Sequence, residues 1–111
     1  MYTEIALSYL ENFSNKNLTE IKNVMSESVT LRDWDAEAFG KTDVVDFMAG
    51  LFSKFDTIDV EVHNVFDSKN TVIVEMTITL EDDKDTNELL VTDVITFDQT
   101  GKIESIRAYL G

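Results

Sequence analysis

The sequence contains no cysteine, no proline, a single histidine and only four glycines among its 111 residues. Without cysteine the chain has no disulfide, no thiolate metal site and no cysteine nucleophile. The one histidine, His63, is too few for a multi-histidine metal site, and no serine–histidine–aspartate triad can be built from it. No glycine-rich loop that could hold a phosphate is present. Several common kinds of active site are therefore excluded.

Basic residues are also scarce: 9 lysines and arginines stand against 22 acidic residues, and the net charge is −13. Such a surface repels phosphate backbones and anionic lipids, so we expect neither nucleic acid nor membrane as a partner. No apolar run approaches the roughly 18 residues of a membrane-spanning helix. The start, MYTEIALSYLENF, lacks the basic region of a signal peptide. We therefore expect a cytoplasmic protein.

The residues that are present are typical of one globular domain spanning residues 1–111, with 43% hydrophobic content. In the first half, apolar residues recur at helical spacing. They predict helices over residues 2–13 and 18–25, and a third helix capped by Thr42. Between the second and third helices, residues 29–34 are predicted to form a short strand. The first half is thus mainly helical.

In the second half the apolar residues alternate, which predicts four strands, over residues 58–66, 72–80, 89–97 and 103–110. Short polar turns separate these strands, and short connections favour an antiparallel meander. Helices followed by such a meander predict an α+β fold, with the helices on one face of a curved antiparallel sheet.

One strand carries an acid in its apolar row. Residues Leu89, Val91, Asp93, Ile95 and Phe97 share one face of the predicted strand, and all except Asp93 are large and apolar. Burial of a charged carboxylate costs several kcal/mol unless it is paired or protonated. Burial would therefore raise the pKa of Asp93, and a neutral carboxyl group donates a hydrogen bond.

The residues alone leave alternatives open for Asp93. It could pair with Arg107 or Lys102 across the last hairpin, or the assignment of its face could be wrong. In either case the side chain would be an ordinary structural or solvated acid.

Two further polar residues share apolar faces. Asp33 ends the row of Val29 and Leu31, and Tyr9 lies on the inner stripe of the first helix. The ordinary interpretations are a solvated strand end for Asp33 and core packing for Tyr9. Trp34 has the opposite parity to Asp33, so it packs outside a pocket or covers its mouth.

Three sequence segments carry a resemblance to a known family. They are V-T-L-R-D at the first strand, G-K-T-D at the start of the third helix, and the ending G-K-I-E-S-I-R-A-Y-L-G. Together they resemble the nuclear transport factor 2-like superfamily with its SnoaL-like proteins and, within it, the ketosteroid isomerases. The resemblance implies a cone-shaped curved antiparallel sheet wrapped around three N-terminal helices. It also implies a pocket between sheet and helices, and a homodimer formed through the outer sheet face.

At the level of residues, Tyr9, Asp33 and Asp93 match the three polar groups of the isomerase site. The resemblance implies that Asp33 is the general base, whereas Tyr9 and a protonated Asp93 donate hydrogen bonds to the oxygen of the reacting carbonyl compound. It implies a small hydrophobic carbonyl ligand, and neither a cofactor nor a metal.

The resemblance leaves two other functions open. One is a SnoaL-like cyclase or hydrolase that uses the same pocket differently, and the other is a non-catalytic ligand-binding or dimerisation domain.

Overall fold

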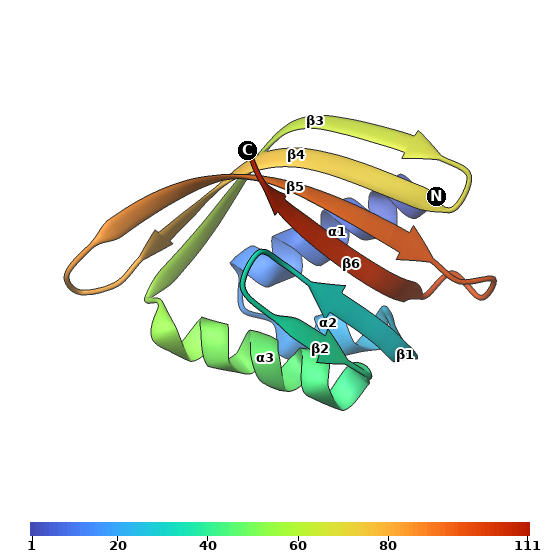
Figure 1. The fold of residues 1–111 in the computed structure, drawn as a ribbon, viewed down its shortest axis with the longest axis horizontal. Helices are drawn as coiled ribbons and strands as arrows, with labels where there is room; N and C mark the ends of the chain where they lie inside the picture. The colour runs from blue at the N-terminus through green and yellow to red at the C-terminus, as the bar shows by residue number, and fades with distance from the viewer.

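A computed structural model describes all 111 residues and has three helices and a six-stranded sheet (Figure 1). This is the predicted α+β architecture. The elements in chain order are α1 (Tyr2–Ser14), α2 (Leu18–Asn23), β1 (Met25–Arg32), β2 (Glu37–Phe39), α3 (Lys41–Lys54), β3 (Thr57–Ser68), β4 (Thr71–Glu81), β5 (Thr86–Phe97) and β6 (Ile103–Leu110).

The strands are arranged in the order β2-β1-β6-β5-β4-β3. Strands β3 to β6 form the predicted antiparallel meander, because each pairs with the next along the chain. The pairing of β1 with β6 is parallel and places Leu31 beside Ile106. This parallel pair was not predicted, since a strand pattern does not specify which distant strand becomes its neighbour.

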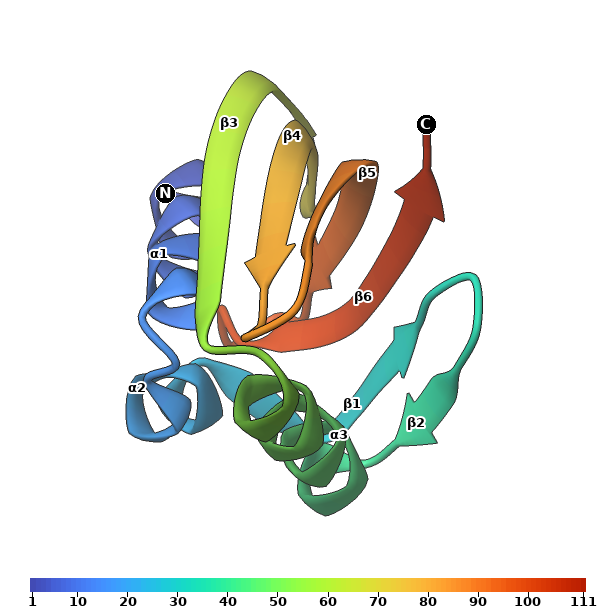
Figure 2. The same cartoon turned by 90° about the vertical axis from the view of Figure 1, so that its left-hand side faces the viewer.

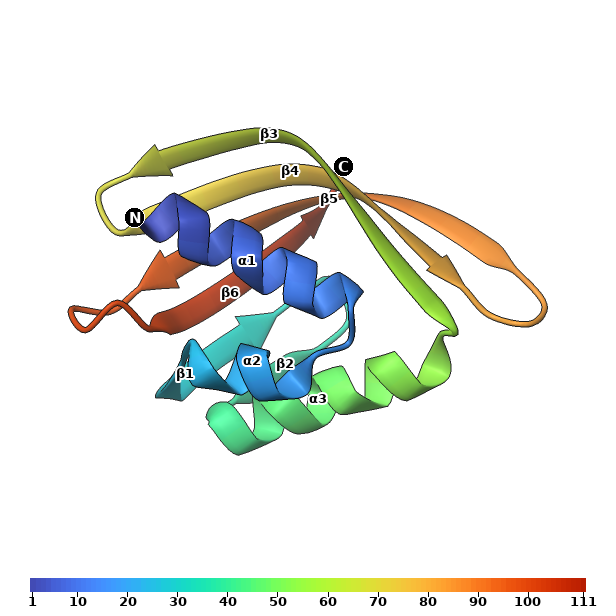
Figure 3. The same cartoon turned by 180° about the vertical axis from the view of Figure 1, so that it is seen from behind.

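The helices lie on the inner side of the curved sheet. Figure 2 shows β3 to β6 bending around the interior, with α1 beside β3 and with α3 at the end near β1 and β2. The same arrangement seen from behind places α1 in front of the long strands (Figure 3). Ala6, Tyr9 and Leu10 form the buried stripe of α1, and at its beginning Tyr2 stacks on Phe97 with ring centroids 4.7 Å apart. The predicted helical stripe is therefore the face that packs on the sheet.

Several predicted boundaries were wrong. The second helix ends at Asn23, and Met25 begins β1 instead of ending the helix. Strand β1 ends at Arg32, so Trp34 lies in the loop beyond it. The short strand β2, which pairs antiparallel with β1, was not predicted. Helix α3 begins at Lys41, one residue before Thr42, so Thr42 is not its cap.

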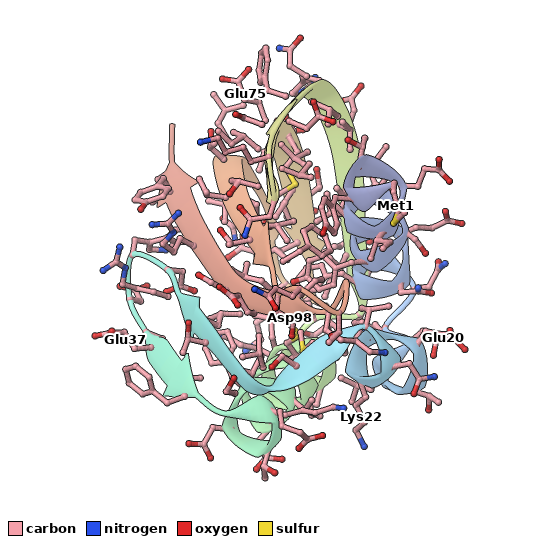
Figure 4. The ribbon with its side chains drawn as sticks, turned by 90° about the vertical axis from the view of Figure 1, so that its right-hand side faces the viewer. Met1, Glu20, Lys22, Glu37, Glu75 and Asp98 are labelled. Atoms are coloured by element: carbon pink, nitrogen blue, oxygen red, sulfur yellow. The ribbon has the colours of Figure 1, made fainter.

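The core contains one polar residue. Of 23 buried residues, 22 are hydrophobic and the other is Asp93. By contrast, three of the acidic side chains labelled in Figure 4, Glu20, Glu37 and Glu75, lie at the periphery of the molecule. The large negative charge is thus carried outside the core. No helix of the protein has the length and the apolar character needed to cross a bilayer.

The turn from β2 into α3 depends on a glycine. Gly40 has φ +89° and ψ 155°, a conformation that is almost restricted to glycine, and its N–H donates to the carbonyl of Val29. We predict that Gly40→Ala lowers the free energy of unfolding by about 1–3 kcal/mol. Gly50 is a matched control, because it lies within α3 with no neighbouring atom within 4 Å of an added methyl group.

Gly50→Ala should therefore raise the free energy of unfolding by about 0.5–1 kcal/mol. Urea denaturation of both variants measures the two effects. Equal changes in the two variants would contradict the role given to Gly40.

Candidate active site

A cavity of about 110 Å³ lies between the helices and the inner face of the sheet. It is somewhat smaller than a cavity of ~150 Å³ that accepts benzene. Fourteen of its 16 lining residues are hydrophobic, and the other two are Asp33 and Asp93. Helix α1 contributes Tyr9, helix α3 contributes apolar side chains such as Phe47, and the remaining walls come from the strands and the β1–β2 loop. The structure therefore brings Tyr9, Asp33 and Asp93 to one apolar cavity.

Asp93 lies in the middle of β5, between Val74 of β4 and Ala108 of β6. Its side chain is buried, with 6% of its surface exposed, and it lines the cavity. Because β5 is paired on both sides, its register is held by two neighbouring strands, and the predicted inward face of Asp93 is confirmed.

Neither predicted alternative partner reaches Asp93. Arg107 stands beside Val94, the neighbour of Asp93 that has the opposite parity and therefore points to the outer face. The Lys102 ammonium donates to the carbonyl of Asn23. The single ion pair of the chain joins Lys41 and Glu27, both far from the cavity lining. Asp93 consequently has no cationic partner.

Burial without a partner changes the acidity of Asp93. Desolvation, which is the larger cause, and the negative charge of Asp33 together raise its pKa from the ordinary value to about 7. At pH values below about 7 the carboxyl group is therefore mostly neutral and able to donate a hydrogen bond.

Tyr9 presents a phenol to the same space. The side chain is buried, with 3% exposed, and burial followed by the nearby Asp93 carboxyl raises the pKa of its hydroxyl well above the usual value. The phenol thus keeps its proton. Neither the Tyr9 hydroxyl nor the Asp93 carboxyl has a hydrogen-bond partner in the chain, yet neither is sealed off from accessible space. Both groups are available to a ligand in the cavity.

Asp33 lies just past β1, in the loop that leads to β2. Its Oδ1 atom accepts hydrogen bonds from the backbone N–H groups of Asp35 and Ala36, both at 2.8 Å. The Asp33 N–H donates in turn to the Ala36 carbonyl. These bonds orient the carboxylate, and Oδ2 has no partner within the chain. This turn was not predicted from the sequence, although an aspartate at a strand end is a typical start for one.

Trp34 is at the mouth of the cavity. It lines the cavity while 42% of its surface remains exposed. Of the two predicted positions, outside the pocket or over its mouth, the structure therefore shows the second. No basic side chain lines the cavity, a feature that the sequence alone did not reveal. Nowhere in the chain do three or more histidine, aspartate or glutamate side chains come together as metal ligands would.

The comparisons with known proteins identify the family and the fold. Residues 6–106 match the model of the SnoaL-like domain. The chain belongs to the SnoaL-like family. No curated protein sequence matches it significantly. The predicted family resemblance is thereby confirmed at the level of fold and family.

Solved structures show how widely this fold is used. A protein from Shewanella denitrificans OS-217, assigned by similarity as a SnoaL-like polyketide cyclase, has a TM-score of 0.89. Its identity is 12%, over 99% of this chain and 90% of that one. An LEH-like epoxide hydrolase from M. tuberculosis also has a TM-score of 0.89, at 14% identity over 99% and 82% of the two chains. A Catenulispora acidiphila DSM 44928 protein with a ketosteroid isomerase-like fold, solved with trimethylamine, has a TM-score of 0.85 at 13% identity over 96% and 84%. At such identities the likeness establishes the fold and leaves the reaction open.

The raised pKa of Asp93 makes the stability of the protein depend on pH. The folded state holds this proton more tightly than the unfolded state, so the contribution of Asp93 to stability is fully present below about pH 4 and is lost as the pH rises through about 7. A difference of about three pKa units corresponds to at most ~4 kcal/mol. Asp93→Asn removes the titration, so we predict that this variant gains stability relative to the wild type between about pH 4 and about pH 8.

Denaturant unfolding at several pH values measures this gain. Asp59→Asn is the matched control, because Asp59 is exposed on β3 and does not line the cavity. If the difference in unfolding free energy between Asp93→Asn and the wild type did not change with pH, Asp93 would have an ordinary pKa.

Proposed function

We propose that this protein is a cofactor-independent enzyme of the ketosteroid isomerase-like type, which transfers a proton at the carbon α to a carbonyl group. One observation carries the proposal. Two buried proton donors, Tyr9 and Asp93, and one oriented carboxylate, Asp33, open into a single apolar cavity. Such a set can serve proton transfer next to a carbonyl group, with a positioned carboxylate as base and two donors for the oxygen.

Asp33 is the proposed base. Its Oδ1 is held by two backbone N–H groups, which leaves Oδ2 to remove a proton from the ligand. Where the carbonyl compound has a β,γ double bond, the electrons move toward the carbonyl oxygen and form a dienolate. Asp33 then returns the proton at the γ carbon, so the double bond becomes conjugated with the carbonyl and no cofactor is consumed.

Tyr9 and neutral Asp93 are the proposed stabilisers of the dienolate. Negative charge develops on the carbonyl oxygen, and hydrogen bonds that strengthen with this charge lower the barrier most in a site without water. The apolar lining supports this role, because it keeps Asp93 protonated and strengthens both hydrogen bonds. The two donors come from different elements, since Tyr9 belongs to α1 and Asp93 to β5.

The proposed substrate is a small hydrophobic carbonyl compound. A volume of about 110 Å³ holds roughly one ring, and a larger ligand would extend past Trp34 toward solvent. The names of the structural relatives include a cyclase and an epoxide hydrolase, so the choice of carbonyl chemistry rests on the residues of this cavity.

We predict that the wild type converts 3-cyclohexenone, a one-ring β,γ-unsaturated ketone, into its conjugated isomer, which absorbs in the ultraviolet. Asp33→Asn should lower kcat/KM by about 10²–10⁴-fold, because the base is lost. Tyr9→Phe and Asp93→Asn should each lower it by about 10²–10³-fold, because each removes one donor to the oxyanion. The rate should also fall as the pH rises above about 7, where Asp93 loses its proton.

Asp35→Asn is the matched control for Asp33→Asn. Asp35 is exposed in the same loop and does not line the cavity, so its substitution should leave kcat/KM within about twofold. Exchange of α hydrogens with deuterated water, followed by NMR, detects proton transfer even without isomerisation. Wild-type exchange no faster than that of Asp33→Asn would rule out the proposal and favour a non-catalytic binding domain.

We also propose a homodimer formed through the outer sheet face. This face exposes the large side chains of Phe66 on β3, Leu90 on β5 and Tyr109 on β6. An interface would cover these apolar side chains. Sedimentation equilibrium should give twice the chain mass of 12.6 kDa, whereas a monomer at high concentration would contradict the dimer.

A further inference from the structure

The charge balance of the cavity is unusual for an apolar site. Asp33 and Asp93 both line it, and the negative charge of Asp33 acts on Asp93. The lining residues from α3, β4 and β6 carry no titratable group, and α1 contributes only the Tyr9 phenol. Thus two carboxyl groups line one apolar space, and no basic side chain accompanies them.

The chain itself has no means of neutralising this pair. Asp93 is more than nine-tenths buried, points into the cavity and makes no hydrogen bond or ion pair. Its candidate cationic partners, Arg107 and Lys102, are occupied elsewhere or lie on the other face. Two carboxylates without a cation are costly in a site of low dielectric constant. A positive group supplied from outside would remove this cost.

The walls are suited to an organic cation rather than to a metal ion. Tyr9, Phe13, Phe47 and Trp34 give the cavity four aromatic side chains, and the faces of aromatic rings attract alkylammonium groups. A metal ion needs several oxygen ligands and a polar surround, but the other lining residues are apolar. An alkyl ring fills apolar space while its ammonium group meets the acids.

We propose that this cavity is a binding site for a small hydrophobic organic cation, a protonated amine of about one ring in size, held between Asp33 and Asp93. The amine would occupy the space of the proposed carbonyl ligand and compete with it. Binding of the amine requires no turnover, so the two proposals can fail separately.

Protonation of Asp93 sets the choice between the two ligands. The neutral carboxyl group donates to a carbonyl oxygen, whereas the ionised group accepts from an ammonium. Amine binding should therefore strengthen as the pH rises through about 7, whereas carbonyl binding should weaken over the same range. Below that pH, binding of the amine should release the proton of Asp93. The other groups that face Asp93, Asp33 and the Tyr9 phenol, do not supply a competing positive charge.

Calorimetry with three small molecules, each containing one ring, tests the proposal. The probes are cyclohexylamine, its neutral counterpart cyclohexanol, and the anion cyclohexanecarboxylate. An alkylamine stays protonated well above pH 8, as a lysine side chain does. If ionised Asp93 is required, cyclohexylamine should bind about tenfold more tightly at about pH 8 than at about pH 6, following the ionised fraction. Cyclohexanol should bind without that rise, and cyclohexanecarboxylate should not bind.

Proton release separates this site from general attraction to an acidic surface. The heat of amine binding at about pH 6, measured in buffers of different ionisation enthalpy, should show the release of nearly one proton. Asp93→Asn should abolish both the release and the pH dependence, and Asp33→Asn should weaken binding by at least tenfold. The control Asp35→Asn should keep the release and bind within about twofold of the wild type.

Two results would overturn the proposal, and both come from the wild type, so they do not depend on the folding of a variant. One is amine binding no tighter than that of cyclohexanol at about pH 8. The other is tight amine binding with no proton release at about pH 6, which would place the amine on the acidic surface.

Discussion

The candidate site depends on the burial of one carboxyl group without a partner. Asp93 lies in the middle of β5, where pairing on both sides leaves its side chain no other direction than inward. The cost of burying its charge is the physical cause of its pKa of about 7. Where a stable fold accepts such a cost, the group is a candidate for function. The apolar lining and the neighbouring Asp33 both raise the pKa of this side chain, and no basic side chain lines the cavity to lower it.

The sequence predicted most of the frame and the inward direction of Asp93, because both depend on periodicity. The alternation in β5 and the stripe of α1 each survive in the fold, since a shift of one residue would expose a whole apolar row. The parallel pairing of β1 with β6 could not be predicted, because it joins distant segments. The hydrogen bonds that orient Asp33 come from backbone N–H groups, which a side-chain pattern does not describe. The lack of a basic side chain in the cavity could not be predicted either, because the lining residues come from segments far apart in the sequence.

On the two proposals the same cavity serves different ligands, because its charge changes near neutral pH. With Asp93 protonated it offers two hydrogen-bond donors and one carboxylate, as a carbonyl reaction needs. With Asp93 ionised it offers two carboxylates surrounded by aromatic rings, as an organic cation needs. The SnoaL-like frame therefore leaves the reaction to a few side chains.

The most direct test is a titration of Asp93 itself. The carboxyl carbon of each aspartate can be followed by NMR against pH in ¹³C-labelled protein, and the Asp93 signal can be assigned by its loss in Asp93→Asn. We expect this signal to titrate with an apparent pKa near 7. A midpoint near about 4, the ordinary value for an aspartate, would contradict the account, because Asp93 could then act neither as a neutral donor nor as a switch near neutral pH.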